Sequence, residues 1–276
     1  MGLDLTEEQI ERYSRNIILP EVGGEGQRKL LASSAFVVGA GGLGSPALLY
    51  LAAAGVGRIG VADSDAVELS NLQRQVIHRT ADLGTNKTLS ARQAIEALNP
   101  DCTVEVVPQR LTAENVRSII EGYDVVLDGS DNFPTRFLVS DACFLERIPL
   151  VSAAVLGLEG QLMTILPGRG NPCYRCFLPE PPPPGLVPTC QEAGVLGSVV
   201  GVMGSLQATE ALKLLLGIGE PLARRLIVYD ALETSFRTAS RSPDPECRLC
   251  GPNATITEVV EQAEAPCCPG GECDVG

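Results

Sequence analysis

The stretch FVVGAGGLGSPALLYLAAAGVGRIGVADSD, from Phe36 to Asp65, decides the fold class. A short apolar run leads into the glycine pattern GAGGLG at residues 39–44, a helical segment follows, and a second apolar run ends at Asp63. This order matches the G-x-G-x-x-G pattern of a nucleotide-binding βαβ unit, in which an acidic residue follows about 20 positions later. Such glycines let the backbone approach a phosphate at a helix N-terminus, and the acid can bind a ribose hydroxyl. The stretch therefore predicts a phosphate site that serves either a dinucleotide or a nucleoside triphosphate.

The following part of the chain repeats this alternation of strands and helices. We predict that Ser45 caps the helix after the glycines, that Pro46 occupies its first helical position, and that the helix ends near Gly55. Strands are expected at 31–38, 58–63, 102–107, 123–127 and 149–153, with further helices at 86–98, 112–121 and 134–146. The alternation predicts a Rossmann-like, doubly wound α/β fold with a mostly parallel sheet and an active site at the carboxyl ends of its strands.

The alternation stops near residue 154. A strand at 160–166, a helix after Gly194 and a strand at 225–229 are expected to form an added C-terminal portion. Between them, a proline-rich stretch predicts a long crossover loop at about 177–193, partly mobile. The folded body should cover residues 1–251. The segment 252–276, which is acidic and rich in glycine and proline at its end, should be a flexible, cysteine-containing tail.

The charge and the apolar stretches of the chain indicate whether it binds nucleic acid or a membrane. The formal net charge is −13, whereas nucleic-acid-binding proteins usually carry a basic patch, so we expect no nucleic-acid partner. The apolar stretch from Gly194 to Gly217 is long enough to cross a membrane. However, Gln207, Glu210 and Lys213 recur along one side, which predicts a core helix and no membrane contact. The N-terminus shows no secretory signal, so we expect a cytoplasmic protein.

Two C-x-x-C pairs stand out among the ten cysteines. Cys173 and Cys176 form one pair, and Cys247 and Cys250 form the other. Each pair can chelate one side of an ion, and four thiolates suit a tetrahedral zinc site. A redox dithiol is the alternative, but a single pair is enough for that chemistry. We predict a structural zinc clamp that joins the C-terminal segment to the start of the long loop.

Polar and basic residues follow the second strand. SNLQRQ, from Ser70 to Gln75, offers amides and the guanidinium of Arg74, and Lys87 follows Asn86 at the start of the next helix. A lysine at a helix N-terminus costs stability unless an anion lies nearby, because that end of a helix already carries partial positive charge. Arg74 and Lys87 are therefore candidates for phosphate contacts, and two solvated basic residues are the alternative.

A polar segment ends the fourth parallel strand. DGSDN, from Asp128 to Asn132, places carboxylates at the same edge of the sheet as the glycine pattern. Asp131 is suited to bind Mg²⁺, which prefers oxygen ligands that it shares with phosphates. A dehydrogenase has little use for such a ligand, so this segment favours a nucleoside triphosphate over a dinucleotide.

Several motifs together resemble those of the MoeB/ThiF family, adenylating enzymes related to ubiquitin activation. In chain order the motifs are RYSRNIILPEVGGEGQRKL, GAGGLGS, AGVGRIGVADSDAVELSNLQRQ, LDGSDN, PCYRC, TCQEAGV, GSLQATEALK and CRLC. They cover about residues 6 to 251, so the resemblance implies that the body is an adenylating domain. The resemblance implies ATP-dependent adenylation of the C-terminal Gly-Gly carboxylate of a small ubiquitin-like sulfur carrier. A thiocarboxylate would then form for molybdopterin, thiamine or tRNA thiolation.

The resemblance also implies a role for particular positions. The nucleotide and its Mg²⁺ would be bound by Gly39, Gly41, Gly42, Gly44, Asp63, Ser70, Asn71, Gln73, Arg74, Lys87, Asp131 and Asn132. The residues implied in catalysis are Arg15, Arg74, Lys87, Asp131 and Cys190. Arg15 matches an arginine that reaches into the site of a partner subunit, which implies a homodimer. The four paired cysteines match the zinc ligands of the family.

Some expectations stay open at this point. Cys190 matches a cysteine that forms a covalent intermediate with the carrier in several relatives, and an unused thiol is the alternative. CGPNATITE resembles the point at which fused relatives continue into a rhodanese domain, so we expect a separate sulfur donor, either a cysteine desulfurase or a rhodanese. His78 is expected to be structural. The alternative activities are a dehydratase that adenylates a tRNA base and an NAD-dependent oxidoreductase.

Overall fold

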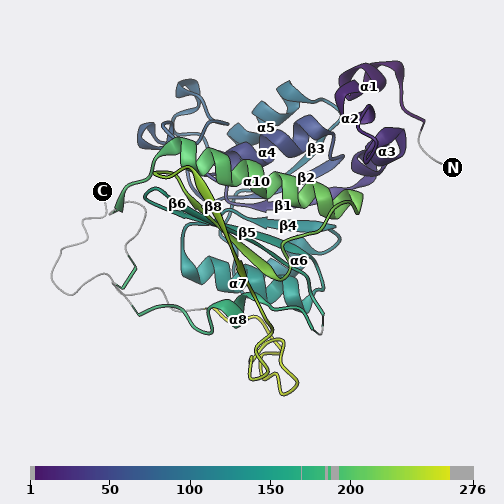
Figure 1. Cartoon of the computed structure of the whole chain (residues 1–276). Coiled ribbons are helices and arrows are strands. Elements are labelled where there is room, and N and C mark those ends of the chain that lie inside the picture. Colours follow the sequence, from purple (N-terminus) through teal and green to yellow (C-terminus); the bar gives the residue numbers. More distant parts are fainter. Residues whose placement is uncertain (1–3, 169, 184–185, 188–192, 262–276) are drawn as a thin grey trace.

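A computed structural model describes residues 4–168, 170–183, 186–187 and 193–261 (Figure 1). Its strands form one eight-stranded sheet in the order β3-β2-β1-β4-β5-β6-β7-β8. Strands β1 to β5 pair in parallel, and β6, β7 and β8 continue the sheet in antiparallel pairs. The strand bounds are β1 Ser34–Val38, β2 Arg58–Ala62, β3 Thr103–Val107, β4 Val125–Asp128, β5 Leu150–Leu156, β6 Glu159–Ile165, β7 Arg225–Asp230 and β8 Ser235–Ser240. The predicted Rossmann-like, mostly parallel α/β fold is confirmed.

Helices cover both faces of the sheet (Figure 1). Helices α4, α5 and α10 pack on one face around residues such as Val37, Val61 and Leu127, and α6 and α7 pack on the other around Phe36 and Val126. The helix bounds are α1 Glu7–Arg12, α2 Ser14–Ile17, α3 Gly23–Ala32, α4 Gly44–Ala54, α5 Lys87–Leu98, α6 Val116–Ile120, α7 Phe133–Leu145, α8 Tyr174–Phe177 and α10 Gly197–Leu216, with short 3₁₀ turns η1 Leu69–Asn71 and η2 Thr80–Asp82.

The start of α4 differs from the prediction. The helix begins at Gly44, one residue before the predicted cap, and no side chain caps its N-terminus. The N–H of Ser45 already donates to the carbonyl of Gly41 over 2.9 Å, while the Ser45 hydroxyl is buried without a hydrogen-bond partner. The predicted capping by Ser45 is therefore wrong, because the glycines tighten the loop enough for the helix to begin earlier. The predicted end is confirmed, since Gly55 adopts a left-handed conformation with φ of 89°.

Other helices and strands differ from their predicted bounds or were not predicted. The strand predicted from residue 31 begins at Ser34, because α3 runs to Ala32. The helix predicted over 112–121 is confined to Val116–Ile120. Strand β8 was not predicted, because at the edge of the sheet its residues are mostly exposed and carry no apolar alternation.

Helix α10 is the apolar segment that raised the question of a membrane span. Within the described residues it is the one helix long and apolar enough to cross a membrane by length and composition, and half of its most apolar window is buried inside the protein. It packs against α4, β5 and β6, and the Gln207 amide donates to two strand carbonyls, Asp128 O at 2.7 Å and Val151 O at 2.8 Å. The predicted core helix is confirmed. The cytoplasmic location stays a prediction.

The segment after Gly251 returns to the body over its described part. Ile256 and Val259 pack against the second apolar cluster, and the N–H of Ala113 donates to a carboxylate oxygen of Glu261. Residues 262–276, including Cys267, Cys268 and Cys273, lie outside the described residues, as does Cys190 in the predicted crossover loop. The division into a body over 1–251 and a flexible tail over 252–276 stays a prediction.

Candidate nucleotide and metal sites

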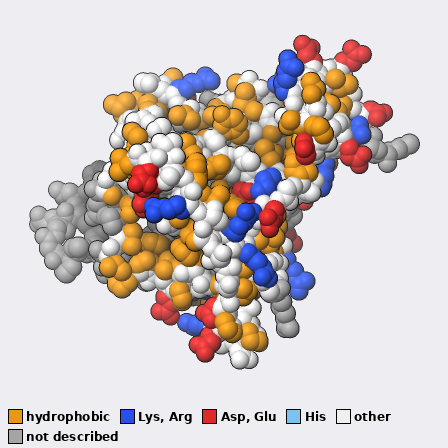
Figure 2. Space-filling model, in the orientation of Figure 1, with side chains coloured by type: hydrophobic (Ala, Val, Ile, Leu, Met, Phe, Trp, Pro, Cys, Tyr) orange, Lys and Arg blue, Asp and Glu red, His pale blue; other side chains and the backbone are white. Residues whose placement is uncertain are grey.

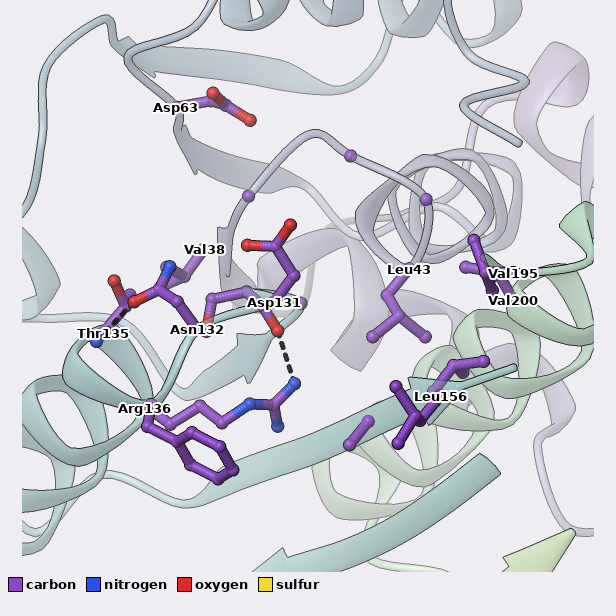
Figure 3. Close-up of a pocket in the computed structure, with 18 of the residues that line it drawn as sticks. Val38, Leu43, Asp63, Asp131, Asn132, Thr135, Arg136, Leu156, Val195 and Val200 are labelled. Carbon is purple, nitrogen blue, oxygen red and sulfur yellow. Dashed lines mark hydrogen bonds between the residues drawn. The ribbon is translucent and has the colours of Figure 1, made fainter. Parts of the chain in front are cut away.

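A cavity of about 710 Å³ opens at the carboxyl ends of the parallel strands (Figure 3). The glycine loop after β1, the end of β2, the start of α5 and the loop after β4 all line it. Eight of the residues predicted to bind the nucleotide or its metal contribute to the lining: Gly39, Gly41, Gly42, Asp63, Arg74, Lys87, Asp131 and Asn132. Segments far apart in the sequence therefore meet at one site, as the doubly wound topology requires.

The glycine loop is too tight for side chains at two positions. Gly39 adopts a φ of 87°, and a Cβ at Gly44 would lie 1.8 Å from the carbonyl oxygen of Gly39. A Cβ at Gly42 would lie 2.7 Å from the side chain of Val200 in α10. The loop therefore packs closely against α10, and its backbone lines the cavity at the N-terminus of α4, which is a favourable place for an anion.

Asp63 lies at the end of β2 and contacts the loop directly. Its Oδ2 accepts from the N–H of Ala40 over 2.8 Å, and its Oδ1 accepts from the N–H of Asp65 over 2.9 Å. Burial raises the pKa of Asp63, whereas the nearby charge of Lys87 and the two N–H donors oppose that rise. Asp63 therefore contacts the glycine loop and also lines the cavity, which is the place expected for the predicted ribose-binding acid.

Lys87 begins α5 and is nearly buried, with 8% of its side chain exposed. Its Nζ donates to Oδ2 of Asp65 over 2.9 Å. We expected that a lysine at this helix N-terminus needs an anion, and Asp65 supplies one. Since Asp65 is 65% exposed, its carboxylate can turn toward solvent and leave the ammonium group to another anion.

The SNLQRQ segment contributes only part of what was predicted. Arg74 lines the cavity and its guanidinium donates to the carbonyl of Ser70. Three predicted residues, Ser70, Asn71 and Gln73, are not among those that line the cavity. The Asn71 side chain closes the turn by accepting from the N–H of Glu68, and Gln73 is exposed. The structure places none of the three in the cavity wall, so their contacts with the nucleotide stay predictions.

Gln75 lines the cavity although sequence reasoning did not select it. It is 4% exposed, and its Oε1 is buried with no hydrogen-bond partner among the described residues. Its Nε2 would lie 3.6 Å from a Cβ at Gly41. The sequence signal was available, because Gln75 closes the same polar segment as Arg74.

The loop after β4 places an acidic residue opposite the glycines. The side chain of Asp131 extends toward the glycine loop in Figure 3, and Asn132 caps α7 by accepting from the N–H of Thr135 over 2.9 Å. Asp131 is exposed within the cavity and available to a cation, whereas the Asn132 side-chain oxygen already has a helix partner. The structure therefore favours Asp131 as the metal ligand predicted here.

A buried arginine, missed from the sequence, supports this loop. Arg136 in α7 is 7% exposed and donates to the carbonyls of Ser130 and Ala153 (Figure 3). Its Nη1 lies 3.7 Å from Oδ2 of Asp128, which also accepts from Ser152. The pair fixes the turn before Asp131. The role of Arg136 could not be predicted from the sequence near it, because its hydrogen-bond partners come from the segments that follow β4 and from β5, which only the fold brings beside α7.

One wall of the cavity is apolar. Leu43, Leu156, Val195 and Val200 line it near the glycine loop (Figure 3), and Phe177 and Leu178 extend it toward the predicted crossover loop. The cavity therefore has room for an apolar or extended segment beside a charged group.

The other predicted catalytic arginine is distant from this cavity. Arg15 in α2 is exposed and does not line it. On the face shown in Figure 2, Lys and Arg side chains are interspersed with Asp and Glu and form no continuous basic stripe, in keeping with the net charge of −13. The surface seen there does not resemble a nucleic-acid-binding face.

The four paired cysteines meet on the opposite side of the sheet from α10. All four Sγ atoms lie within 4.8 Å of one another, with Cys173 and Cys247 3.5 Å apart and Cys176 and Cys250 3.2 Å apart. Four sulfurs about 2.3 Å from a zinc ion at tetrahedral angles are separated by about 3.8 Å. The predicted grouping is confirmed, and the cluster is suited to one metal ion.

The cysteine cluster is joined to α7 by a buried ion pair. Arg175, between Cys173 and Cys176, donates to both carboxylate oxygens of Asp141 over 2.7 to 3.2 Å, and it packs over the ring of Phe137. It also donates to the carbonyl of Pro179. The cluster thus fixes where the predicted crossover loop leaves the body.

The sequence was compared with families, curated proteins and solved structures. Residues 13–249 match the ThiF family. The chain is 54% identical over 260 residues to the sulfur carrier protein adenylyltransferase of Thermus thermophilus, covering 93% of this chain and 96% of that protein. It is 53% identical over 251 residues to the SAMP-activating enzyme E1 of Haloferax volcanii, covering 91% of this chain and 92% of that protein.

Longer relatives and solved structures add to this result. The chain is 50% identical to the adenylyltransferase and sulfurtransferase MOCS3-1 of Zea mays over 92% of its own length, but it spans 54% of that protein. The crystal structure of E. coli MccB shares the fold, with a TM-score of 0.77 at 23% sequence identity, over 91% of this chain and 74% of that one. The family match spans nearly all of the described body, and the Thermus and Haloferax relatives are matched over nearly their whole length. The chain therefore belongs to the ThiF family.

Proposed function

We propose that this protein catalyses the ATP-dependent adenylation of the C-terminal Gly-Gly carboxylate of a small ubiquitin-like sulfur carrier. The observation that carries this proposal is the cavity that joins a glycine loop, two cationic side chains, an available carboxylate and an apolar wall. The Thermus relative is named for the adenylation of a sulfur carrier protein, which supports the same chemistry here.

Four charged residues of the cavity would have distinct tasks in this reaction. Asp63 would accept from a ribose hydroxyl, while Arg74 and Lys87 would donate to phosphate oxygens and neutralise the charge that spreads over them in the transition state. Asp131 would hold Mg²⁺, which supplies charge neutralisation at the phosphates. The carrier carboxylate attacks the α-phosphorus atom, the bond to the bridging oxygen breaks, and pyrophosphate leaves with the electron pair. The product is an acyl-adenylate.

Lys87 would change its partner when the nucleotide binds. In the structure its ammonium group is paired with Asp65, which is largely exposed. A phosphate in the cavity offers a stronger, multiply charged acceptor, so the ammonium group would leave Asp65 or share its protons between the two. The existing pair keeps a nearly buried charge compensated before the nucleotide binds.

The remaining partners follow from the same reaction. The extended Gly-Gly end of the carrier would lie along the apolar wall, because residues without side chains can pass between Leu43 and Leu156. A separate cysteine desulfurase or rhodanese would supply the sulfur that converts the acyl-adenylate to a thiocarboxylate. The thiocarboxylate would serve molybdopterin, thiamine or tRNA thiolation.

A homodimer would complete the site. Arg15 is exposed and does not line the cavity of its own chain, so its proposed catalytic role requires a second subunit. Ile18 and Leu19, which follow it, are 67% and 51% exposed. Apolar side chains at this exposure are suited to an interface around Arg15. Zinc bound by the four cysteines would stabilise the fold and leave no coordination position for catalysis.

The proposal is tested by ATP–pyrophosphate exchange with candidate carriers that end in Gly-Gly. We expect exchange that requires both Mg²⁺ and the carrier, and that falls at least about 100-fold in Asp131→Ala, because a group that stabilises transition-state charge is lost. Glu114→Ala, which removes an exposed carboxylate away from the cavity, should leave exchange unchanged. Exchange that is indifferent to removal of the terminal Gly-Gly would contradict the proposal.

A further inference from the structure

His78 is the one histidine of the chain, and it lies beneath the glycine loop. Its residue is 6% exposed, its Nε2 lies 2.9 Å from the carbonyl oxygen of Ala40, and its Nδ1 lies 2.8 Å from the hydroxyl of Ser90 in α5. A carbonyl oxygen can only accept a hydrogen bond, so Nε2 must carry a proton. The contact thus fixes both the position of the ring and its protonation at Nε2.

Hydrogen bonds restrain the peptide groups on both sides of Ala40. Its N–H donates to Oδ2 of Asp63 over 2.8 Å, and its carbonyl accepts from His78. Asp63 is the acid proposed to bind the ribose. Glycines flank Ala40 on both sides, and these two hydrogen bonds restrain the two peptide groups that Ala40 belongs to. The neighbouring peptide groups are held by the bonds from the Gly39 N–H to Ala62 and from the Ser45 N–H to Gly41.

The orientation of one N–H group follows from the peptide geometry. The carbonyl of Ala40 and the N–H of Gly41 belong to the same planar, trans peptide, so they point in opposite directions. Since His78 takes the carbonyl, the N–H of Gly41 points away from the imidazole. Gly41 lines the cavity, and in the described part of the chain its N–H takes part in no hydrogen bond.

We infer that His78 is a positioning residue for nucleotide binding: it holds the Ala40–Gly41 peptide so that the Gly41 N–H donates to a phosphate of ATP. His78 itself does not touch the nucleotide. The inference rests on the proposed function, because that function places a nucleoside triphosphate in this cavity. It differs from a purely structural role, because it predicts an effect on phosphate recognition beyond any effect on folding.

A buried chain of polar groups keeps the imidazole in place. Ser90, 1% exposed, donates its hydroxyl proton to Oδ2 of Asp82 over 2.8 Å, and its oxygen lies 2.8 Å from Nδ1 of His78. Asp82 in turn accepts from the N–H of Arg79 over 2.9 Å. These contacts link η2 and α5 to the glycine loop. Burial lowers the pKa of His78, which favours the neutral ring, and the carbonyl of Ala40 requires that the proton of this ring be at Nε2.

The test uses His78→Asn and His78→Gln as a matched pair. Both carry the same amide, but the glutamine amide reaches the place of Nε2, whereas the asparagine amide reaches only that of Nδ1. We expect His78→Asn to raise the Kd for ATP about tenfold, the usual effect of one lost hydrogen bond to a charged group, and His78→Gln to restore most of this loss. The Kd for adenosine, which has no phosphate, should change less than about twofold in either variant.

The untagged wild-type protein provides an independent measurement, because its single histidine gives one imidazole signal in nitrogen-15 NMR spectra. We expect the Nε2-protonated tautomer at pH 7.5. An Nδ1-protonated ring, equal ATP affinity in the two variants, or a parallel loss of adenosine and ATP would each overturn the inference. ATP binding without carrier-dependent exchange would contradict the proposed function alone. A wild-type protein that binds no ATP would contradict both.

Discussion

At the scale of single residues, burial shifts the pKa values of Asp63 in the cavity wall and of His78 behind the glycine loop. Burial raises the pKa of Asp63 and lowers that of His78, so each is shifted toward its neutral form. Lys87 is nearly buried but remains compensated by Asp65. Groups with shifted pKa values that surround one cavity are typical of functional sites. The two shifts also have opposite consequences for the free energy of unfolding.

The pH dependence of stability should reveal the contribution of His78. Its pKa is lowered chiefly by burial, with Lys87 adding to this, while the Ala40 carbonyl, Asp63 and Asp82 oppose it. The unfolded chain therefore binds a proton at higher pH than the folded protein does. The free energy of unfolding therefore keeps its full value with respect to His78 above about pH 6.5, where the ring is neutral in both states. It decreases as the pH falls below that value, because the unfolded chain binds the proton first.

We accordingly expect wild type to lose more stability between pH 7.5 and 5.5 than His78→Gln, as measured by urea unfolding at each pH. The comparison isolates His78, because Asp63 is present in both proteins and its raised pKa gives the opposite slope. Equal losses in the two proteins would show that His78 titrates alike in the folded and unfolded states.

At the scale of elements, the junction of β1 with α4 is the tightest part of the site. The loop passes so close to the helix that a side chain at Gly44 has no room beside the carbonyl of Gly39. In α10, by contrast, a Cβ at Gly201 would meet nothing within 4 Å. A side chain is therefore excluded sterically at Gly44 but not at Gly201.

Gly44→Ala and Gly201→Ala should change stability in opposite directions. We expect Gly44→Ala to lower the free energy of unfolding by about 2 kcal/mol or more, because a Cβ only 1.8 Å from the carbonyl oxygen of Gly39 displaces the loop. Gly201→Ala should raise it by about 0.5–1 kcal/mol, because alanine loses less conformational entropy in a helix. Urea unfolding measures both. A tolerated Gly44→Ala with intact ATP affinity would mean that the loop has more room than the structure shows.

At the scale of the whole molecule, the cysteine cluster joins segments that are distant in the sequence. It connects residues 173–176 to residues 247–250, and Arg175 extends that connection to α7 through Asp141. Helix α7 begins beside Asp131, so the cluster and the cavity share one supporting helix. Loss of the metal should therefore affect both stability and the site.

Metal analysis should give about one zinc ion per chain. We expect Cys247→Ser to lose the ion and to unfold at a lower temperature, because a thiolate ligand is removed and the C-terminal segment is released. Cys102→Ala removes a buried thiol outside the cluster and should keep the ion. Mass spectrometry of metals and thermal unfolding provide the measurements, and a metal-free wild type with an unchanged unfolding temperature would contradict the zinc assignment.

The sequence alone was enough for the fold class and much of the site. The glycine spacing, Asp63 and the strand–helix alternation are local patterns, and local patterns follow directly from backbone sterics and side-chain periodicity. The paired cysteines were recognisable for the same reason, since two ligands three residues apart can hold one ion. Asn86 was placed correctly at a helix start, and its side chain caps α5 in the structure. The capping of α7 by Asn132 was not predicted.

The tertiary structure decided which of those residues act together. Packing of β4 and β5 against α7 makes Arg136 a support for the Asp131 loop, and the turn after β2 brings Gln75 to the cavity while leaving Gln73 outside it. The contact of His78 with Ala40 joins positions 38 residues apart. Such contacts depend on long-range packing, whose geometry no local pattern contains. The sequence by itself therefore determined the class of fold and the phosphate loop, and only the assembled sheet decided which side chains reach that loop.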